Sequence, residues 1–169
     1  MDDAVGPLSF PDFYRLHVPG LVAFVMWLGA GAEDAADIAQ ETMIKAYKRW
    51  QGIEHPRAWA RTVASREYCR RIAECRDESV AQIPHGLLDA YLADVGEAGL
   101  LGKEQALVLA TLRLLPYRQR QVMAWVYDGY TPAEIAKFLG LDPGTVRVSL
   151  HKARETLKRH LESEGGQPR

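Results

Sequence analysis

Apolar residues recur three or four positions apart along most of the chain, which is the spacing of one face of an α-helix. In the first half they form two stripes: Leu16, Leu21, Phe24, Val25 and Leu28, then Ile38, Met43, Ile44 and Tyr47. Residues typical of helix ends bound these stripes, with a capping arrangement at Ser9 to Asp12, glycines at 29 and 31, and Pro56 at the start of a third helix. The pattern predicts a helix that begins near Ser9 and ends at Gly29, followed by helices over 33–50 and 56–76.

The second half has sharper helix boundaries. Pro116 separates predicted helices over 103–115 and 117–127. Thr131 and Glu134 form a capping box for a short helix that ends at Gly140, and Asp142-Pro143 begins a long helix to about 162. Two inward stripes are predicted: Ile135, Ala136 and Leu139, then Val146, Leu150, Ala153, Leu157 and Leu161. Because no segment alternates with the period of a strand, the predicted fold class is all-α.

Charge divides the 169-residue chain into three parts. Apolar residues make up 47% and charged residues 25%, which are globular values, and the formal net charge is −1. Basic residues gather in 57–76 and 137–159, whereas 77–102 contains several acidic residues, glycines and a proline but no Lys or Arg. The sequence therefore predicts two small helical domains, 9–76 and 103–163, joined by an acidic linker over 77–102 in which 86–94 could form a short helix.

Several classes of function are disfavoured by what the sequence lacks. The longest apolar run, Leu21 to Leu28, is too short to span a bilayer, and the acidic start Met-Asp-Asp is unlike a secretory signal. Cys69 and Cys75 fit a reducing cytoplasm without disulfides, with redox sensing as a minor alternative. The chain has no glycine-rich phosphate loop, no HExxH pair and no nucleophile elbow, and its five histidines are scattered. We expect no enzyme activity, metal, cofactor or small-molecule substrate.

The segment from Thr131 to Leu161 has the layout of a helix-turn-helix: a short helix, a tight glycine turn and a long helix. In that motif the first turns of the long helix read base edges in the major groove. The candidate base-reading residues are Thr145, Arg147, Val148, Ser149, His151 and Lys152. An ordinary helical hairpin with a cationic surface is the alternative reading of this segment.

Residues 114–157 resemble the C-terminal domain of extracytoplasmic-function (ECF) sigma factors. The resemblance is carried by Leu115-Pro116, Arg120 and Val122, by Gly129, Thr131, Glu134, Ile135, Ala136, Leu139 and Gly140, and by Gly144, Thr145, Val146, Arg147, Leu150, Lys152, Ala153 and Arg154. In the first half, Asp37-Ile-Ala-Gln40-Glu41-Thr42 and the segment from Pro56 to Ala64 resemble two motifs of sigma domain 2. The two motif sets stand in the family's order.

The resemblance implies a transcription initiation factor with several contact surfaces. Asp37, Gln40 and Glu41, which share one helix face, would bind the β′ clamp helices of core RNA polymerase, while the second domain would meet the β flap. The third helix and the loop before it, with its turn at Gly52 to Pro56, would melt and hold the promoter −10 element. The candidate residues there are His55, Arg57, Arg61, Arg66 and Arg70. The helix-turn-helix would bind the −35 element.

The sequence departs from the family pattern at two places. Arg66 stands where the family often has Asn, and Val148-Ser149 replaces the usual Ser-Arg pair, so the −10 and −35 base preferences do not follow from the resemblance. Trp59 is expected in the core rather than as a stacking platform. A separate anti-sigma protein is left open as a partner. A helix-turn-helix regulator that binds duplex DNA without polymerase is the alternative function.

Overall fold

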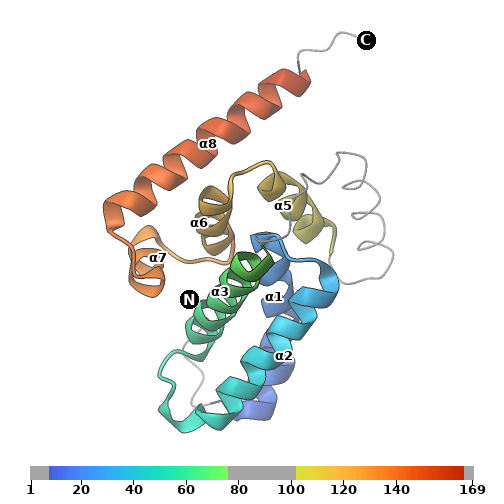
Figure 1. Cartoon of the computed structure of the whole chain (residues 1–169), viewed down its shortest axis with the longest axis vertical. Helices are drawn as coiled ribbons and strands as arrows, with labels where there is room; N and C mark the ends of the chain where they lie inside the picture. The colour runs from blue at the N-terminus through green and yellow to red at the C-terminus, as the bar shows by residue number, and fades with distance from the viewer. Residues whose placement is uncertain (1–7, 76–101, 166–169) are drawn as a thin grey trace.

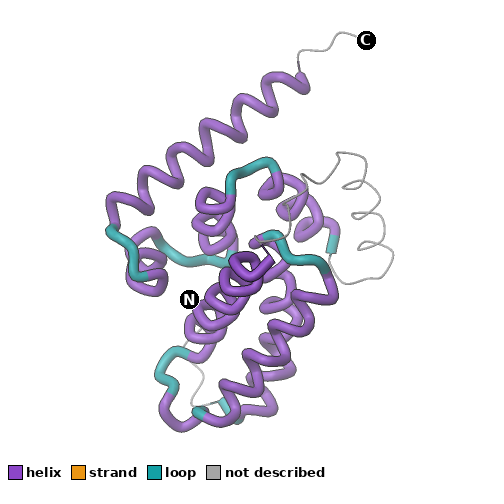
Figure 2. The backbone as a smooth tube through the Cα atoms, in the orientation of Figure 1, coloured by secondary structure: helices purple, strands orange, loops and turns teal. Residues whose placement is uncertain are grey.

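The computed structural model describes residues 8–75 and 102–165, which form α-helices and one short 3-10 turn (Figures 1 and 2). The elements are α1 Phe10–Leu28, α2 Ala32–Lys48, η1 Trp50–Gly52, α3 Pro56–Cys75, α5 Lys103–Arg113, α6 Tyr117–Tyr127, α7 Pro132–Leu139 and α8 Pro143–Gly165. The all-α prediction is confirmed for these ranges. Residues 76–101, which include the predicted helix 86–94 and all but the last residue of the predicted linker, lie outside the described residues.

The helix ends follow the local signals in the sequence. The Ser9 hydroxyl caps α1 by accepting from the Asp12 backbone N–H over 3.4 Å. Gly29, with φ of 121°, ends the same helix, and Gly140, with φ of 64°, ends α7 in the left-handed conformation. The second helix is shorter than predicted, because Arg49 ends α2 and Trp50 begins the 3-10 turn.

The first three helices pack side by side, with the second half of α1 at the centre (Figure 1). Every residue of α1 from Ala23 to Leu28 is buried. Three residues expected in the apolar stripes are instead exposed: Leu16 by 64%, Ile44 by 54% and Tyr47 by 67%. Helix geometry explains the first two, because Leu16 precedes Leu21 by five residues rather than four, and Ile44 directly follows the buried Met43.

The two halves of the chain share one apolar cluster. Helices α5 and α6 pack on α1, and the ring of Phe24 meets the buried Trp125 edge-on at 5.4 Å. The Trp27 Nε1–H donates to the Gln105 carbonyl over 3.3 Å. Helix α8 extends away from this body (Figure 1). No helix in the described ranges is long and apolar enough to cross a membrane.

Arg120 fixes the junction between the halves. Its guanidinium donates to the carbonyls of Leu112 and Leu115, near the end of α5, and to that of Leu28, at the end of α1, over 3.0 to 3.4 Å. The Leu28 carbonyl is one of those that a helix leaves without an intrahelical partner at its C-terminus. Burial lowers the pKa of Arg120. Arg120 therefore holds the ends of α1 and α5 together in the described fold.

Candidate nucleic-acid and polymerase interfaces

Helix α2 presents an acidic face to solvent. The structure places Asp37, Gln40 and Glu41 on the exposed side of this helix, as their spacing predicts. The side-chain amide of Gln40 donates to the Tyr14 hydroxyl over 2.9 Å, and Glu41 accepts from Arg71 Nη2 over 2.9 Å. Two of the three side chains are thus oriented by neighbouring helices, which the sequence pattern did not indicate.

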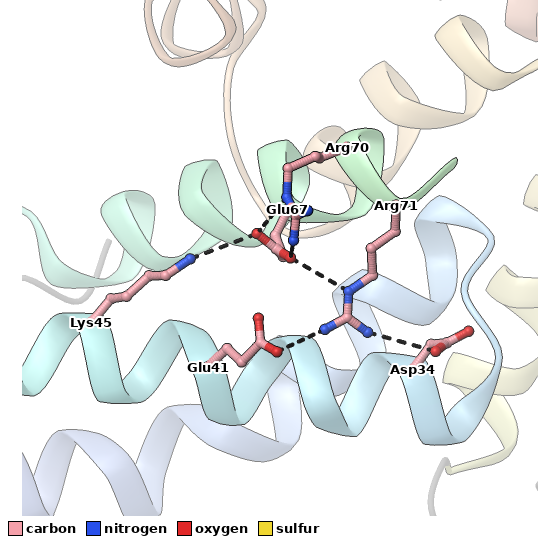
Figure 3. Close-up of polar contacts among 6 residues, drawn as sticks. All are labelled: Asp34, Glu41, Lys45, Glu67, Arg70 and Arg71. Carbon is pink, nitrogen blue, oxygen red and sulfur yellow. Dashed lines mark hydrogen bonds and ion pairs between the residues drawn. The ribbon is translucent and has the colours of Figure 1, made fainter. Parts of the chain in front are cut away.

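A charge network joins this face to α3 (Figure 3). Its centre is the Glu67 carboxylate, which is only 8% exposed and lies 3.6 Å from Lys45 Nζ. Arg70 and Arg71, on the same helix as Glu67, both donate to it. The hydrogen bond from Arg70, followed by the charges of Arg70 and Lys45, lowers the pKa of Glu67 against the opposing effect of burial. Arg71 continues the network to Glu41 and, at 3.6 Å, to Asp34.

The four arginines predicted to meet −10 DNA lie on two sides of α3. Arg57 and Arg61 point toward the turn between α6 and α7, where both pair with Asp128. Arg66 and Arg70 are exposed on roughly the opposite side of the helix. The structure therefore does not bring the four together. His55 is exposed just before α3, and its carbonyl accepts from the Trp59 N–H over 2.9 Å.

An aromatic hollow of about 840 Å³ opens beside the start of α3. It is lined by Phe10, Tyr47, Lys48, Arg49, Trp50, Gln51, Gly52, Ile53 and Trp59. Trp59, which was expected in the core, is half-buried: it packs against the core and lines this hollow as well. Trp59, Arg66 and Arg70 are seven and four residues apart, so they follow one face of α3 away from the hollow. Trp59 at the hollow and the cations Arg66 and Arg70 thus share one face of α3.

Helices α7 and α8 form the predicted helix-turn-helix. Thr131 and Glu134 make the reciprocal capping box, in which the carboxylate of Glu134 accepts from the Thr131 N–H over 2.7 Å. This backbone hydrogen bond is the main cause that lowers the pKa of Glu134. Asp142 Oδ2 accepts from the N–H groups of Gly144 and Thr145, which caps the start of α8. The N-terminus of α8 is therefore capped by the side chain of the residue that precedes the helix.

The candidate base-reading residues divide by exposure. Thr145, Arg147, Val148, His151 and Lys152 are exposed on α8, whereas Ser149 is only 8% exposed. Ser149 borders a hollow of about 550 Å³ between α8 and the start of α6. That hollow adds Arg118, an exposed cation which the sequence reading missed, beside Lys152. The feature of the sequence that could have identified Arg118 is its place as a basic residue in the first turn of the helix after Pro116.

Comparison with known proteins finds two family models that match separate parts of the chain. The family model for sigma-70 region 2 matches residues 13–76, and the model for sigma-70 region 4 matches residues 105–157. The RNA polymerase sigma-E factor of Streptomyces avermitilis is 29% identical over 92% of this chain and 87% of its own length. The ECF RNA polymerase sigma factor SigL of Mycobacterium tuberculosis is 30% identical over 90% and 88%.

A solved structure has a similar fold. It is the sigma factor RpoE, in the co-crystal structure of RpoE with the anti-sigma factor NepR from Bartonella quintana. The TM-score is 0.66 at 21% identity, and the match covers 90% of this chain and 96% of that one. The likeness extends over both halves of the fold.

Proposed function

The chain belongs to the sigma-70 family, in its ECF group, and as a sigma factor it directs RNA polymerase to promoters; from that premise we propose which of its surfaces binds polymerase and which bind each promoter element. Residues 9–76 act as the domain that binds core polymerase and the −10 element, and residues 103–163 as the domain that binds the −35 element. Residues 77–102 link them. The observation that carries this is the presence of an acidic helix face, an aromatic hollow and a helix-turn-helix in one chain.

The acidic face of α2 is the proposed contact for the β′ clamp helices. Asp37, Gln40 and Glu41 share it with Ile44, whose side chain is 54% exposed. These four positions follow the i, i+3, i+4, i+7 pattern of a single helix face. An exposed apolar residue amid oriented polar groups is typical of the centre of a protein interface.

The aromatic hollow is the proposed holder of the melted −10 strand. Taking a base out of the stack costs a few kcal/mol, which a pocket with stacking surfaces can offset. Tyr47, Trp50 and Trp59 provide rings in the hollow, and Arg66 and Arg70 continue as cations along α3. This combination of rings and cations suits an unpaired strand. Because Arg57 and Arg61 lie on the other side of α3, we assign them to backbone phosphates rather than to the extruded base.

The exposed start of α8 is the proposed reader of the −35 element. Thr145, Arg147, Val148, His151 and Lys152 stand where a recognition helix meets base edges and phosphates. Arg118 and Lys152 border one hollow, so they are placed to hold a phosphate between α6 and α8. The buried Ser149 supports the packing of α8 rather than reading a base.

Two further properties belong to the same proposal. We infer that the chain works as a non-catalytic subunit in the cytoplasm, where promoter DNA and polymerase are found. The RpoE of Bartonella quintana was solved with an anti-sigma factor, and a separate anti-sigma protein is likewise proposed as a partner here. A helix-turn-helix regulator without polymerase is not favoured, because it would leave the region 2 match unexplained.

Runoff transcription tests the proposed contacts. Purified chain is added to sigma-free core polymerase and a pool of genomic promoter fragments, and the transcripts are mapped. We expect transcripts that share upstream −10 and −35 motifs. The double variant Asp37→Ala/Gln40→Ala should lose core binding and transcripts, whereas Glu162→Gln, an exposed charge change on α8, should keep both. Footprints on duplex DNA without core binding would instead support the plain regulator.

A further inference from the structure

The turn after α6 places a carboxylate against two cations of α3. Asp128 has a side chain that is 8% exposed, and its Oδ2 accepts from Arg61 Nε over 2.8 Å. Its Oδ1 lies 3.3 Å from Nη2 of Arg61 and 3.2 Å from Nη2 of Arg57. The backbone carbonyl of Asp128 also accepts from Arg57 over 2.6 Å. One residue of the C-terminal half thus pairs with both arginines of the N-terminal half.

The burial of Arg61 makes this pairing important. Its side chain is 2% exposed and lies between the Asp128 turn and α1, where its guanidinium faces the Phe24 ring at 5.9 Å. A buried guanidinium is stable only when a carboxylate or several acceptors compensate its charge. Asp128 supplies that carboxylate, while Nη1 of Arg61 has no hydrogen-bond partner within the described part of the chain. Loss of the Asp128 charge would therefore penalise the packed arrangement strongly.

The packed arrangement cannot be the promoter-bound one. Two promoter elements about two helical turns apart are separated by roughly 70 Å along B-form DNA. In the structure, however, Arg61 on α3 and Asp128, in the turn just before α7, are held at hydrogen-bond distance. The halves must therefore separate before each can reach its own element, and Arg57 and Arg61 are freed when they do.

We propose that Asp128 is an intramolecular latch, which occupies an anion site formed by Arg57 and Arg61 in the closed chain and gives that site up to promoter phosphate in the open chain. The inference rests on the proposed function for the role of the open chain, but the closed contact stands on the structure. The carboxylate imitates the phosphodiester that arginine pairs bind. Tyr130, stacked under Arg57 at 5.1 Å, completes the closed site.

The latch adds to an apolar contact that also holds the halves together. Phe24 and Trp125 are both fully buried where α1 meets α6, so opening exposes them as well. A ligand that binds only the open form has its apparent affinity reduced by the open fraction. A change that weakens only the latch should therefore raise apparent affinity for open-state ligands without creating any new contact.

The first test measures opening in the full chain without polymerase. Asp128→Asn keeps the shape of the side chain and removes the charge, and Glu104→Gln removes one exposed charge from α5 as the matched control. Small-angle X-ray scattering should show a larger radius of gyration for Asp128→Asn than for wild type and the control. Equal radii for all three would overturn the latch. Circular dichroism should show the same helix content throughout, and a loss confined to Asp128→Asn would mean a fold defect and also count against it.

The second test measures whether the freed arginines take phosphate. The probe is a fluorescent twelve-nucleotide oligo(dT), titrated at low salt against each chain. We expect Asp128→Asn to bind at least about threefold more tightly than wild type, and the gain to be lost in Arg57→Gln/Asp128→Asn. A gain that persists in the double variant would overturn the anion site. Neither readout requires transcription, so failure of the latch and failure of the sigma activity in runoff assays are distinguishable.

Discussion

Arg71 on α3 donates from Nη2 to Oε1 of Glu41 on α2 across 2.9 Å. The same guanidinium donates from Nε to Glu67, one turn earlier on α3 (Figure 3). The proposed polymerase face of α2 and the proposed DNA face of α3 are therefore tied by one charge network. Because Glu67 also holds Arg70, its carboxylate orients a proposed DNA contact while it supports the packing of the two helices.

Glu67→Gln should lower the free energy of unfolding by about 1 kcal/mol at pH 7, the scale of partly exposed ion pairs in a network. The change leaves Lys45, Arg70 and Arg71 without their shared carboxylate. Since the fold lowers the pKa of Glu67, the stabilisation is present above its ordinary value of 4.5 and is lost as pH falls through the lower folded value. Urea unfolding at pH 7 and at successively lower pH should show the difference between the two chains shrink.

The exposed Glu162 provides the control for this prediction. Glu162→Gln removes the same charge from α8, far along the chain from the network, and should change stability by less than about 0.5 kcal/mol. A difference between wild type and Glu67→Gln that does not depend on pH would argue that packing, rather than charge, makes Glu67 matter.

Gly29→Ala should destabilise the fold by about 1–3 kcal/mol, the usual cost of placing a side chain in a left-handed conformation. Gly29 has φ of 121°, and a Cβ there would collide with Arg120 Nη1 and lie 2.9 Å from the Tyr68 hydroxyl. Because Arg120 holds the ends of α1 and α5, the collision should loosen the junction of the halves. Thermal and urea unfolding measure the effect.

Gly52→Ala is the matched substitution. A Cβ at Gly52 meets nothing within 4 Å, and its φ is not positive. We expect a change in stability within about 0.5 kcal/mol. Equal destabilisation by both alanines would mean that the close approach of Arg120 to Gly29 is not what constrains this turn.

Tyr47→Ala should weaken holding of the melted −10 strand by about 1–3 kcal/mol, the range for loss of one stacking ring. Tyr47 lines the aromatic hollow and is 67% exposed, so its removal costs the core little. Permanganate reactivity of −10 thymines in polymerase complexes should fall, while binding to −35 duplex stays unchanged. Leu16→Ala changes an exposed apolar residue on a different helix, α1, and should affect neither readout. A similar fall in permanganate reactivity for Leu16→Ala would contradict the assignment of Tyr47 to the −10 strand.

Local signals predicted the helices well because caps and periodicity act within a few residues. Thr131 with Glu134, Pro143 and Gly140 each fix a helix end through neighbours in sequence. The pairing of Arg61 with Asp128 joins residues 67 positions apart, and no periodic pattern encodes it. The aromatic hollow was missed for the same reason, since Phe10, Trp50 and Trp59 meet only after α1 and α3 pack.

Helix α8 shows which details the sequence pattern does not predict. Helical spacing places Ser149 beside Val148 and does not say which of the two the first turn of α6 covers. The structure gives the answer, with Val148 52% exposed and Ser149 buried beside Pro116. Likewise, the position of Arg118 next to Lys152 depends on how α6 meets α8, which the sequence alone did not fix.

Val148→Ala and Lys152→Ala should affect −35 binding in different ways. Val148 has only apolar atoms to offer a base edge, so its truncation should change preference at one base pair, by about 1 kcal/mol or somewhat more. Lys152 shares a hollow with Arg118 and is placed for phosphate, so its loss should weaken all duplexes alike and reduce the slope of log affinity against log salt by about 1. Affinities for a set of single-base −35 variants, each measured at several salt concentrations, separate the two effects. Ser149→Ala, at a buried position on the same helix, should leave both specificity and salt slope unchanged; a specificity change there would mean that α8 meets DNA by a different face.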